Sequence, residues 1–310
     1  KLYLDMKKKS AFIFFISFFL QINCHCNFIF NADSSFNLKK IIWVGSSEFL
    51  LASSSLFALD RIWYAQYPKT RFHTFNDSKD WLQMDKVGHG VTSYYISYLN
   101  YELFRWSECS KNKSIWLGST LGLAYLTTIE VMDGFYNEWG FSYYDMISNL
   151  MGIGLFSTQQ YFWDEQRIKL KFSFAQSGLA GFRPSLLGSS IQEQILKDYN
   201  GQTYWVSINI HSFLKKESNF PKWMNIALGY GADGMIGGSN NDYSMCNGNT
   251  NCLNLKRTRQ FYISLDADLT KIAWKNKFMR ALTRTIGFIK VPFPALEINS
   301  NQSTFHWLYF

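Results

Sequence analysis

The spacing of apolar residues changes near residue 167 and divides this sequence into two parts. Before that point, four mostly apolar stretches are long enough for helices; after it, apolar and polar residues alternate. A long apolar stretch favours an α-helix, whereas alternation with a period of two is typical of a strand whose two faces differ. The order of the two patterns predicts an α+β fold, in which a helical bundle precedes an antiparallel, β-rich C-terminal part.

The helical part is expected to cover residues 36–166. Polar connectors separate its apolar stretches, which are rich in Gly, Ser and Thr and run over Ile41–Leu59, Val87–Phe104, Ile115–Met132 and Met146–Trp163. Small residues let helices approach closely, in membranes especially. We therefore expect a membrane-associated four-helix bundle, with a soluble bundle as the alternative.

The β-rich part is expected to cover residues 167–310. Alternation marks strands at 168–174, 204–210, 224–230 and 261–267, and the chain ends in the aromatic segment Phe305–Phe310. This last segment resembles the closing strand of bacterial outer-membrane barrels, although such barrels need about eight strands to close. The pattern predicts either a sheet packed on the helices or an outer-membrane-associated barrel. Between the last strands, Lys271–Lys290 predicts a basic amphipathic helix that lies on an anionic membrane or covers the sheet.

The first 30 residues have the features of an export signal. Met6 and three lysines precede the apolar run Ala11–Leu20, which is too short to span a bilayer comfortably. Lipidation at Cys24 and cleavage without a lipid both remain open. In an exported chain Cys246 and Cys252 could form a disulfide around the polar loop between them. The signal places the protein on the periplasmic side of the cell envelope.

Charge and aromatic content point to a membrane as the neighbour of the β-rich part. Residues 167–310 hold 17 Lys and Arg against 8 Asp and Glu, whereas residues 36–166 hold 10 against 13. Aromatic residues make up 18% of the chain. Basic and aromatic surfaces suit an anionic membrane, and the sequence carries no recognisable nucleic-acid-binding module. The expected partner is a membrane lipid or another envelope component, at the outer membrane, and not a nucleic acid.

Three polar groups interrupt the apolar stretches of the helical part. They are Asp85-Lys86-x-x-His89, Glu130-x-x-Asp133-Gly134 and Gly140-Phe141-Ser142-x-x-Asp145-x-x-x-Asn149-x-x-Gly152. Spacings of three and four residues put side chains on one face of a helix, and Ser142 with Asp145 has the form of a capping box. Burying a charged side chain destabilises the fold by several kcal/mol unless a neighbouring polar group pairs with it. We therefore expect the three groups to meet at one end of the bundle.

Such a cluster is compatible with three roles. His89 could act as a general base, with Glu130, Asp133 and Asp145 as acids, and with Asp85, Lys86, Ser142 and Asn149 as binding residues. Alternatively, His89, Glu130 and Asp133 could bind a divalent cation, which is the cofactor that the sequence allows. The third role is a structural polar network that fixes the register of the helices without turnover.

The same three motifs resemble the YfiM-like family of unknown function, described as predicted periplasmic lipoproteins, over about residues 40–175. The stretches 197–202, 220–235 and 292–297 resemble the longer members of that family in Bacteroidota-type bacteria. The order of polar residues is also similar, more distantly, to that of the VanZ-like membrane proteins associated with glycopeptide-antibiotic resistance. The resemblance implies a periplasmic location and a helical architecture, and it implies no particular reaction.

Together these features predict an exported envelope protein with a structural or interaction role at a membrane surface, organised around the polar cluster. The alternative is an enzyme, a hydrolase or transferase, that acts on an envelope lipid or a lipid-linked glycan through the same cluster. Whether the chain is an enzyme therefore depends on where the cluster lies and whether a ligand can reach it.

Overall fold

A computed structural model describes residues 37–310, except 66, 216, 242–253 and 301. The predicted signal, the lipidation site at Cys24 and the predicted Cys246–Cys252 disulfide lie outside the described residues.

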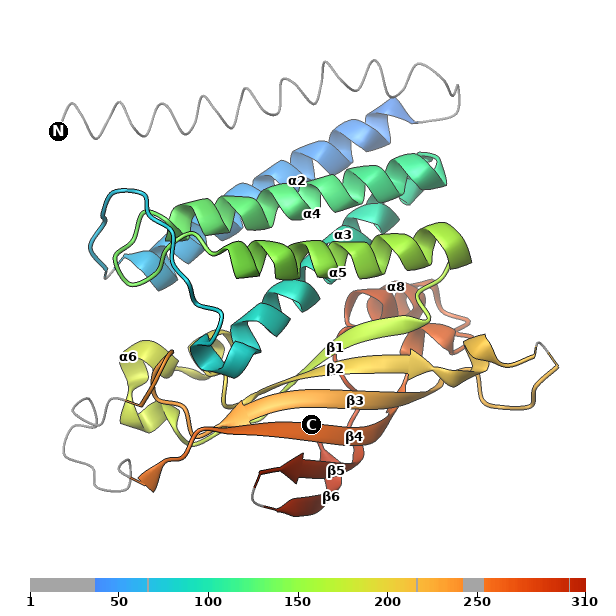
Figure 1. Cartoon of the computed structure of the whole chain (residues 1–310). Helices are drawn as coiled ribbons and strands as arrows, with labels where there is room; N and C mark the ends of the chain where they lie inside the picture. The colour runs from blue at the N-terminus through green and yellow to red at the C-terminus, as the bar shows by residue number, and fades with distance from the viewer. Residues whose placement is uncertain (1–36, 66, 216, 242–253, 301) are drawn as a thin grey trace.

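Four long helices form the N-terminal half (Figure 1). They are α2 (Leu38–Leu59), α3 (Met84–Trp106), α4 (Lys111–Asp133) and α5 (Tyr143–Trp163), and they confirm the four predicted helices. The side chains of Asn37 and Ser142 cap α2 and α5 by accepting hydrogen bonds from backbone N–H groups three residues on. Helices α2 and α4 are long and apolar enough to cross a membrane by length and composition, properties that core helices of soluble proteins share.

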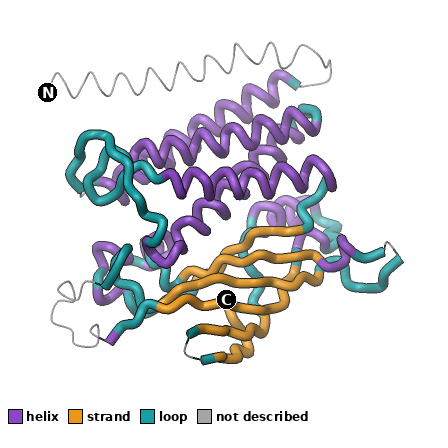
Figure 2. Tube along the Cα trace, in the orientation of Figure 1, coloured by secondary structure: helices purple, strands orange, loops and turns teal. Residues whose placement is uncertain are grey.

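A six-stranded antiparallel sheet forms the C-terminal half (Figure 2), with its strands in sequence order (Figure 1). The strands are β1 (Ile168–Phe174), β2 (Gln202–Asn209), β3 (Met224–Asp233), β4 (Thr258–Ala267), β5 (Phe293–Asn299) and β6 (Ser303–Tyr309). The predicted α+β class is thus confirmed. Strand β5 was not among the predicted strands, because Pro294 interrupts its pattern and a proline argues against a strand interior.

The sheet is strongly curved across its strands, so that strands far apart in the strand order approach each other. The ring of Tyr309 in β6 lies 5.9 Å from that of Trp205 in β2, although three strands separate β2 from β6 in the sheet. The edge of β1 is covered by a backbone bridge from Phe172 to Ile289. The bridge shows that the predicted basic helix Lys271–Lys290 was too long. The helical segment, α8, covers Lys277–Thr285 alone, because the chain after it extends along β1.

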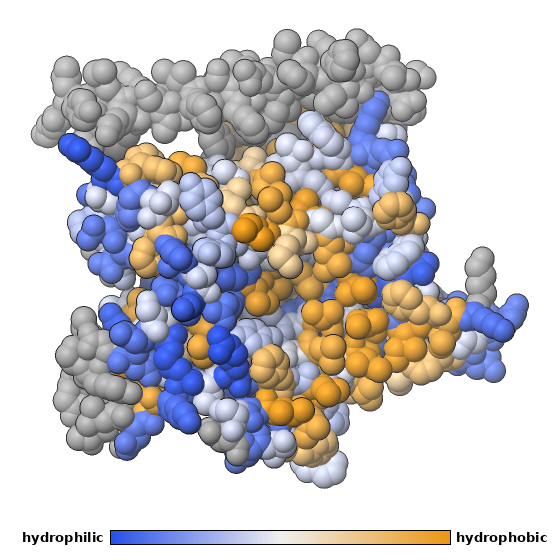
Figure 3. Space-filling view, viewed as in Figure 1, coloured by the Kyte–Doolittle hydropathy of each residue, from blue (hydrophilic) through white to orange (hydrophobic). Residues whose placement is uncertain are grey.

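In an ordinary soluble sheet the buried face is apolar and the exposed face is polar, whereas in this sheet the arrangement is largely reversed. Its buried face carries polar and small residues, including an ion pair of 2.6 Å between Lys171 and Asp266 and a hydrogen bond from Ser207 to Asp266. Trp205 and Tyr262 are also buried on this face. Most other apolar side chains of the sheet point the other way, and those that remain exposed include Val206, Ile226, Leu228, Phe261, Ile263, Leu265, Leu296, Ile298 and Phe305. A broad apolar surface over the sheet is visible in Figure 3.

Helix α3 packs on one part of this apolar face and joins the two halves of the protein. Met84 and Val91 of α3 form a buried cluster with Tyr204 of β2, and Leu170 and Phe172 of β1 pack against it. This contact brings the start of α3, where the predicted polar residues lie, next to the β-rich half.

Candidate functional site

The polar motifs meet at one end of the bundle, where α3 and α5 begin and α4 ends. Close packing of α3 on α5 brings them together. A Cβ atom on Gly152 would lie 2.0 Å from the carbonyl oxygen of Gly90 and 2.1 Å from the hydroxyl of Ser93, so only glycine allows this approach. One helical turn before Gly152, Asn149 consequently faces His89 across the helix interface.

Lys86 is the cation at the centre of the cluster, and it is buried. Its Nζ atom lies 2.5 Å from a carboxylate oxygen of Asp77, 2.8 Å from one of Asp85 and 2.8 Å from one of Asp145. Ser142 donates a hydrogen bond of 2.6 Å to the other oxygen of Asp77. The ammonium group thereby joins the connector before α3 to the first turns of α3 and α5.

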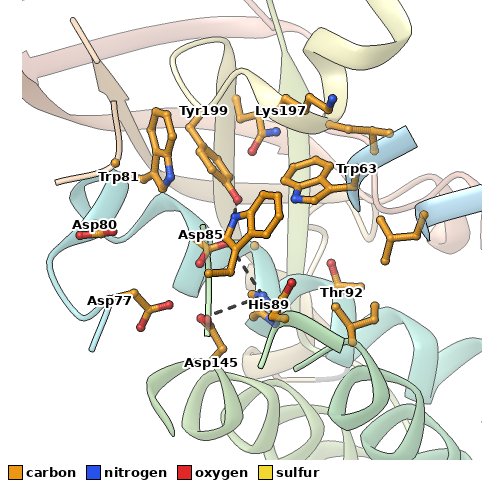
Figure 4. Close-up of a pocket in the computed structure, with 18 of the residues that line it drawn as sticks. Trp63, Asp77, Asp80, Trp81, Asp85, His89, Thr92, Asp145, Lys197 and Tyr199 are labelled. Atoms are coloured by element: carbon orange, nitrogen blue, oxygen red, sulfur yellow. Dashed lines mark hydrogen bonds and ion pairs between the residues drawn. The ribbon is translucent and has the colours of Figure 1, made fainter. Parts of the chain in front are cut away.

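His89 lies beside the same carboxylates as Lys86 and faces several acceptors. Its Nδ1 atom is 3.2 Å from the side-chain oxygen of Asn149. Its Nε2 atom is 3.5 Å from Glu130, 3.8 Å from Asp85 and 4.0 Å from Asp145, each distance measured to a carboxylate oxygen. Figure 4 shows Asp85 and Asp145 pointing toward the imidazole.

The two acids of α4 occupy different surroundings. Glu130 is 1% exposed, and its Oε2 atom accepts a hydrogen bond of 3.2 Å from the backbone nitrogen of Ser142. Asp133 instead accepts a hydrogen bond of 2.5 Å from the hydroxyl of Tyr64. The predicted metal set of His89, Glu130 and Asp133 is therefore not the tightest group. Ligand atoms within 4.8 Å of one another come from Asp85, His89 and Asp145.

Burial and crowding of like charges shift the pKa values of these acids. Burial, together with the charges of Asp145 and Asp133, raises the pKa of Glu130 to about 9. Burial also raises the pKa of Asp133 to about 7, against the hydrogen bond from Tyr64. Glu130 therefore holds a proton far more readily than an exposed glutamate does.

Asp85 and Asp145 interact strongly, and their pKa values move in opposite directions. Burial raises the pKa of Asp145, and the charge of Asp85 adds to this effect. Burial acts to raise the pKa of Asp85 as well, but His89, Lys86 and the hydrogen bonds from Lys86 and Tyr199 outweigh it and lower the pKa. Asp85 is thus the acid of this pair that stays ionised.

Three contributors were not predicted from the sequence: Tyr64, Asp77 and Tyr199. Tyr199 lies in the connection before β2 and donates a hydrogen bond of 2.7 Å to Asp85. Asp77 belongs to the polar connector before α3, and that position was the one sequence signal that could have identified it. Tyr199 lies in the stretch 197–202 that resembles the longer family members, but nothing in that stretch predicts a contact with Asp85. Nothing in the sequence pattern marks Tyr64, which reaches the site through the tertiary fold.

The polar connector that contains Asp77 leads into α3 through an unusual backbone turn. Trp81, Leu82 and Gln83 have φ angles of 49°, 51° and 67°, in the left-handed region that disfavours side chains. Contacts to the β-rich half hold the turn: the backbone nitrogen of Trp81 donates to the carbonyl of Gly238, and Arg259 donates to the side chain of Gln83. Strain held in this way is common at functional sites.

The cluster forms part of the wall of a large cavity, of about 940 Å³. Asp77, Asp85, His89, Asp133 and Asp145 all line it, so the charged end is open to a ligand. Aromatic and aliphatic residues make up much of the remaining wall, among them Trp63, Tyr67, Trp81, Tyr95, Ile96, Leu99, Leu126, Phe172 and Tyr204. The labelled side chains of Figure 4 surround this space.

The arrangement offers two kinds of chemistry. An imidazole held by Asn149 beside carboxylates has the parts of a general base with its acid partners. The same imidazole and carboxylate oxygens are also ligands that divalent metals accept. Both depend on the Nε2 atom of His89, which faces the carboxylates.

Comparison with known proteins adds a similarity to one family but no activity. No curated protein and no solved structure matches the chain. Residues 74–160 match the family model described as predicted periplasmic lipoprotein, DUF2279, and this segment contains Asp77, α3, α4 and most of α5. The match supports an exported, periplasmic location. Over residues 74–160, the chain is therefore similar to a family of predicted periplasmic lipoproteins of unknown function.

Proposed function

We propose that this protein binds an amphiphilic molecule of the cell envelope, a lipid or a lipid-linked glycan, in the cavity beside His89. The observation that carries the proposal is the composition of the cavity wall, which is charged at one end and aromatic or aliphatic elsewhere. Its volume of about 940 Å³ lies at the upper end of the range for small-molecule sites. A polar head group fits the charged end and a hydrocarbon chain fits the rest.

The charged end also has the parts needed to act on a bound ligand. His89, oriented by Asn149, could take a proton from water or from a hydroxyl group, and the raised pKa of Glu130 leaves that acid able to donate one. The same pocket thus accommodates the enzyme alternative, a hydrolase or transferase for an envelope lipid or lipid-linked glycan.

The test is occupancy of the cavity. Thr92 is exposed and lines the cavity, so Thr92→Trp should fill the space without disturbing the core. Thr158→Trp is the matched control, because Thr158 is equally exposed on α5 and does not line the cavity. Each variant is purified from envelopes in mild detergent, and its organic extract is analysed by mass spectrometry. We expect a co-purifying amphiphile with the wild type and the control, and little with Thr92→Trp; equal recovery from all three would refute the proposal.

A second function, contact with a membrane surface, is favoured by the inverted polarity of the sheet. Exposed Leu228, Phe261 and Ile263 lie on the outer face, while the inner face buries the Lys171–Asp266 ion pair. Apolar side chains outside and polar groups inside are typical of strands that meet lipid. The basic excess of the β-rich half adds attraction to anionic head groups.

Flotation with anionic vesicles tests this contact. Phe261→Glu places a charge on the outer face of β4 and should weaken vesicle binding. Ile191→Glu makes the same kind of change at an exposed apolar residue of α7 (Ile191–Lys197), away from the sheet, and should leave binding unchanged. Equal flotation of both variants would argue against the sheet as the contact surface.

A further inference from the structure

The side-chain atoms around His89 Nε2 are an unusual set of acceptors. Because the amide oxygen of Asn149 can only accept, His89 Nδ1 carries the proton of this hydrogen bond and Nε2 presents a lone pair. Carboxylate oxygens of Glu130, Asp85 and Asp145 face this lone pair at 3.5–4.0 Å. Electron-rich atoms gathered in this way repel one another unless positive charge lies between them.

Glu130 provides an independent sign that something binds here. Its side chain is 1% exposed, and its Oε1 atom accepts no hydrogen bond from any described residue. That oxygen is the one aimed at His89 Nε2. A buried carboxylate oxygen without a donor is costly, and native proteins normally satisfy such atoms with a ligand, an ion or water.

We propose that Asp85, His89 and Asp145 bind a divalent metal ion, with Glu130 as a fourth ligand. The candidate ligand atoms of the first three residues lie within 4.8 Å of one another. Metal–ligand distances of about 2.0–2.2 Å require only that these side chains close by a few tenths of an ångström. One imidazole with several carboxylates suits manganese, iron or zinc. Asn149, which orients the imidazole, is a positioning residue for this site.

Lys86 makes the proposal sharply testable, because it competes for the same carboxylates. Its ammonium group contacts Asp85 and Asp145, together with Asp77, and the oxygen of Asp145 that it contacts at 2.8 Å is the one that faces His89. Three carboxyl groups therefore share one ammonium group, so the cluster holds more acidic groups than its one lysine can neutralise. Removing the lysine charge should strengthen metal binding, whereas a purely structural network around Lys86 would gain no metal affinity by losing its centre.

A bound cation would also decide what the pocket accepts. Six carboxylates and two basic side chains line the cavity, so its charged end repels anionic head groups. A divalent cation supplies the positive charge that a phosphate group needs. This consequence rests on the proposed amphiphile pocket, and it narrows the expected ligand to one with a phosphate-bearing head group.

The experiment measures Mn²⁺ binding to delipidated, chelator-treated full-length protein by electron paramagnetic resonance, with no lipid present. We expect one Mn²⁺ per chain, with binding weakened at least about tenfold by His89→Gln and by Asp85→Asn and strengthened by Lys86→Met. Asp80→Asn is the matched control, because Asp80 lines the same cavity but bonds to Ser239 outside the cluster. Circular dichroism of each variant establishes that it is folded.

Several outcomes would overturn the metal site: no Mn²⁺ bound by the wild type, equal weakening by Asp80→Asn, or no gain in Lys86→Met. None of them bears on the amphiphile, whose recovery is measured separately with Thr92→Trp. A final arm adds inorganic phosphate and records the broadening of its phosphorus resonance. Broadening by protein-bound Mn²⁺ that disappears in His89→Gln supports the phosphate-bearing head group, and its absence in the wild type contradicts it.

Discussion

The Nδ1 atom of His89 lies 3.2 Å from the side-chain oxygen of Asn149, and this contact from α5 determines which nitrogen of the imidazole faces the carboxylates. Without it, the ring could rotate or carry its proton on Nε2. Either change would remove the lone pair that both base catalysis and metal binding require.

The tautomer of His89 can therefore be predicted. With 5 histidines in the chain, nitrogen-15 spectra can be assigned by substitution. We expect the neutral ring of His89 to carry its proton on Nδ1 in the wild type and to lose this preference in Asn149→Ala. His211, far along the chain in the β-rich half, should give the same spectrum in both proteins. A proton on Nε2 in the wild type would contradict the arrangement.

The second prediction concerns the stability that Lys86 provides. Lys86→Met leaves Asp77, Asp85 and Asp145 buried without their cation, so the free energy of unfolding in the presence of a chelator should fall by about 3–5 kcal/mol. Lys40 supplies the control, since it forms a 2.6 Å ion pair with Glu108 at the surface. Lys40→Met should cost at most about 1 kcal/mol. Urea denaturation measures the free energy of unfolding of both variants. Equal decreases would show that burial does not strengthen the contribution of the Lys86 ion pairs to stability.

The helices and most strands were predictable because their patterns are local. Each helix of the bundle has its own apolar stretch, and each predicted strand its own alternation. Strand β5 escaped prediction because Pro294 interrupts its pattern, and the basic helix was drawn too long because its sequence does not reveal that Ile289 pairs with Phe172. Pairing across more than a hundred residues is a tertiary property.

The polar residues of α3, α4 and α5 at the site could be predicted from the sequence, whereas the residues that reach it from other segments could not. Apolar surroundings made the polar motifs of α3, α4 and α5 conspicuous, and the packing of those helices brings His89 near Glu130, Asp145 and Asn149. The turn of Asp133 toward Tyr64 could not be predicted, because Tyr64 reaches it from a different segment. Which face of the sheet is buried was equally inaccessible, since alternation has the same period in both cases.

Two glycines of α5 give a matched test of helix packing. A methyl group on Gly152 would collide with the backbone of Gly90 and with Ser93 in α3, so Gly152→Ala should separate the helices and lower the melting temperature severely. Gly154 has nothing within 4 Å of its Cβ position. Gly154→Ala should therefore stabilise the protein by about 0.5–1 kcal/mol through helix propensity alone. Thermal unfolding distinguishes the two; a stable Gly152→Ala variant would mean that α3 and α5 pack less closely than described.

The last prediction concerns Lys290, which is buried on the inner face of the sheet with its Nζ atom 4.6 Å from the centre of the Trp205 ring. Burial lowers the pKa of Lys290 from 10.5 to about 8, although Asp266 acts to raise it. The unfolded chain therefore binds more protons than the folded one between these values, so this group makes stability rise with pH over that window. Below about pH 8 its cost to folding is fully present. Subtracting the pH–stability profile of Lys290→Met from that of the wild type should reveal this rise, because groups remote from Lys290 titrate alike in both proteins. The exposed Lys277→Met provides the control, and a flat difference profile for Lys290→Met would show that its ammonium group is solvated in the folded protein.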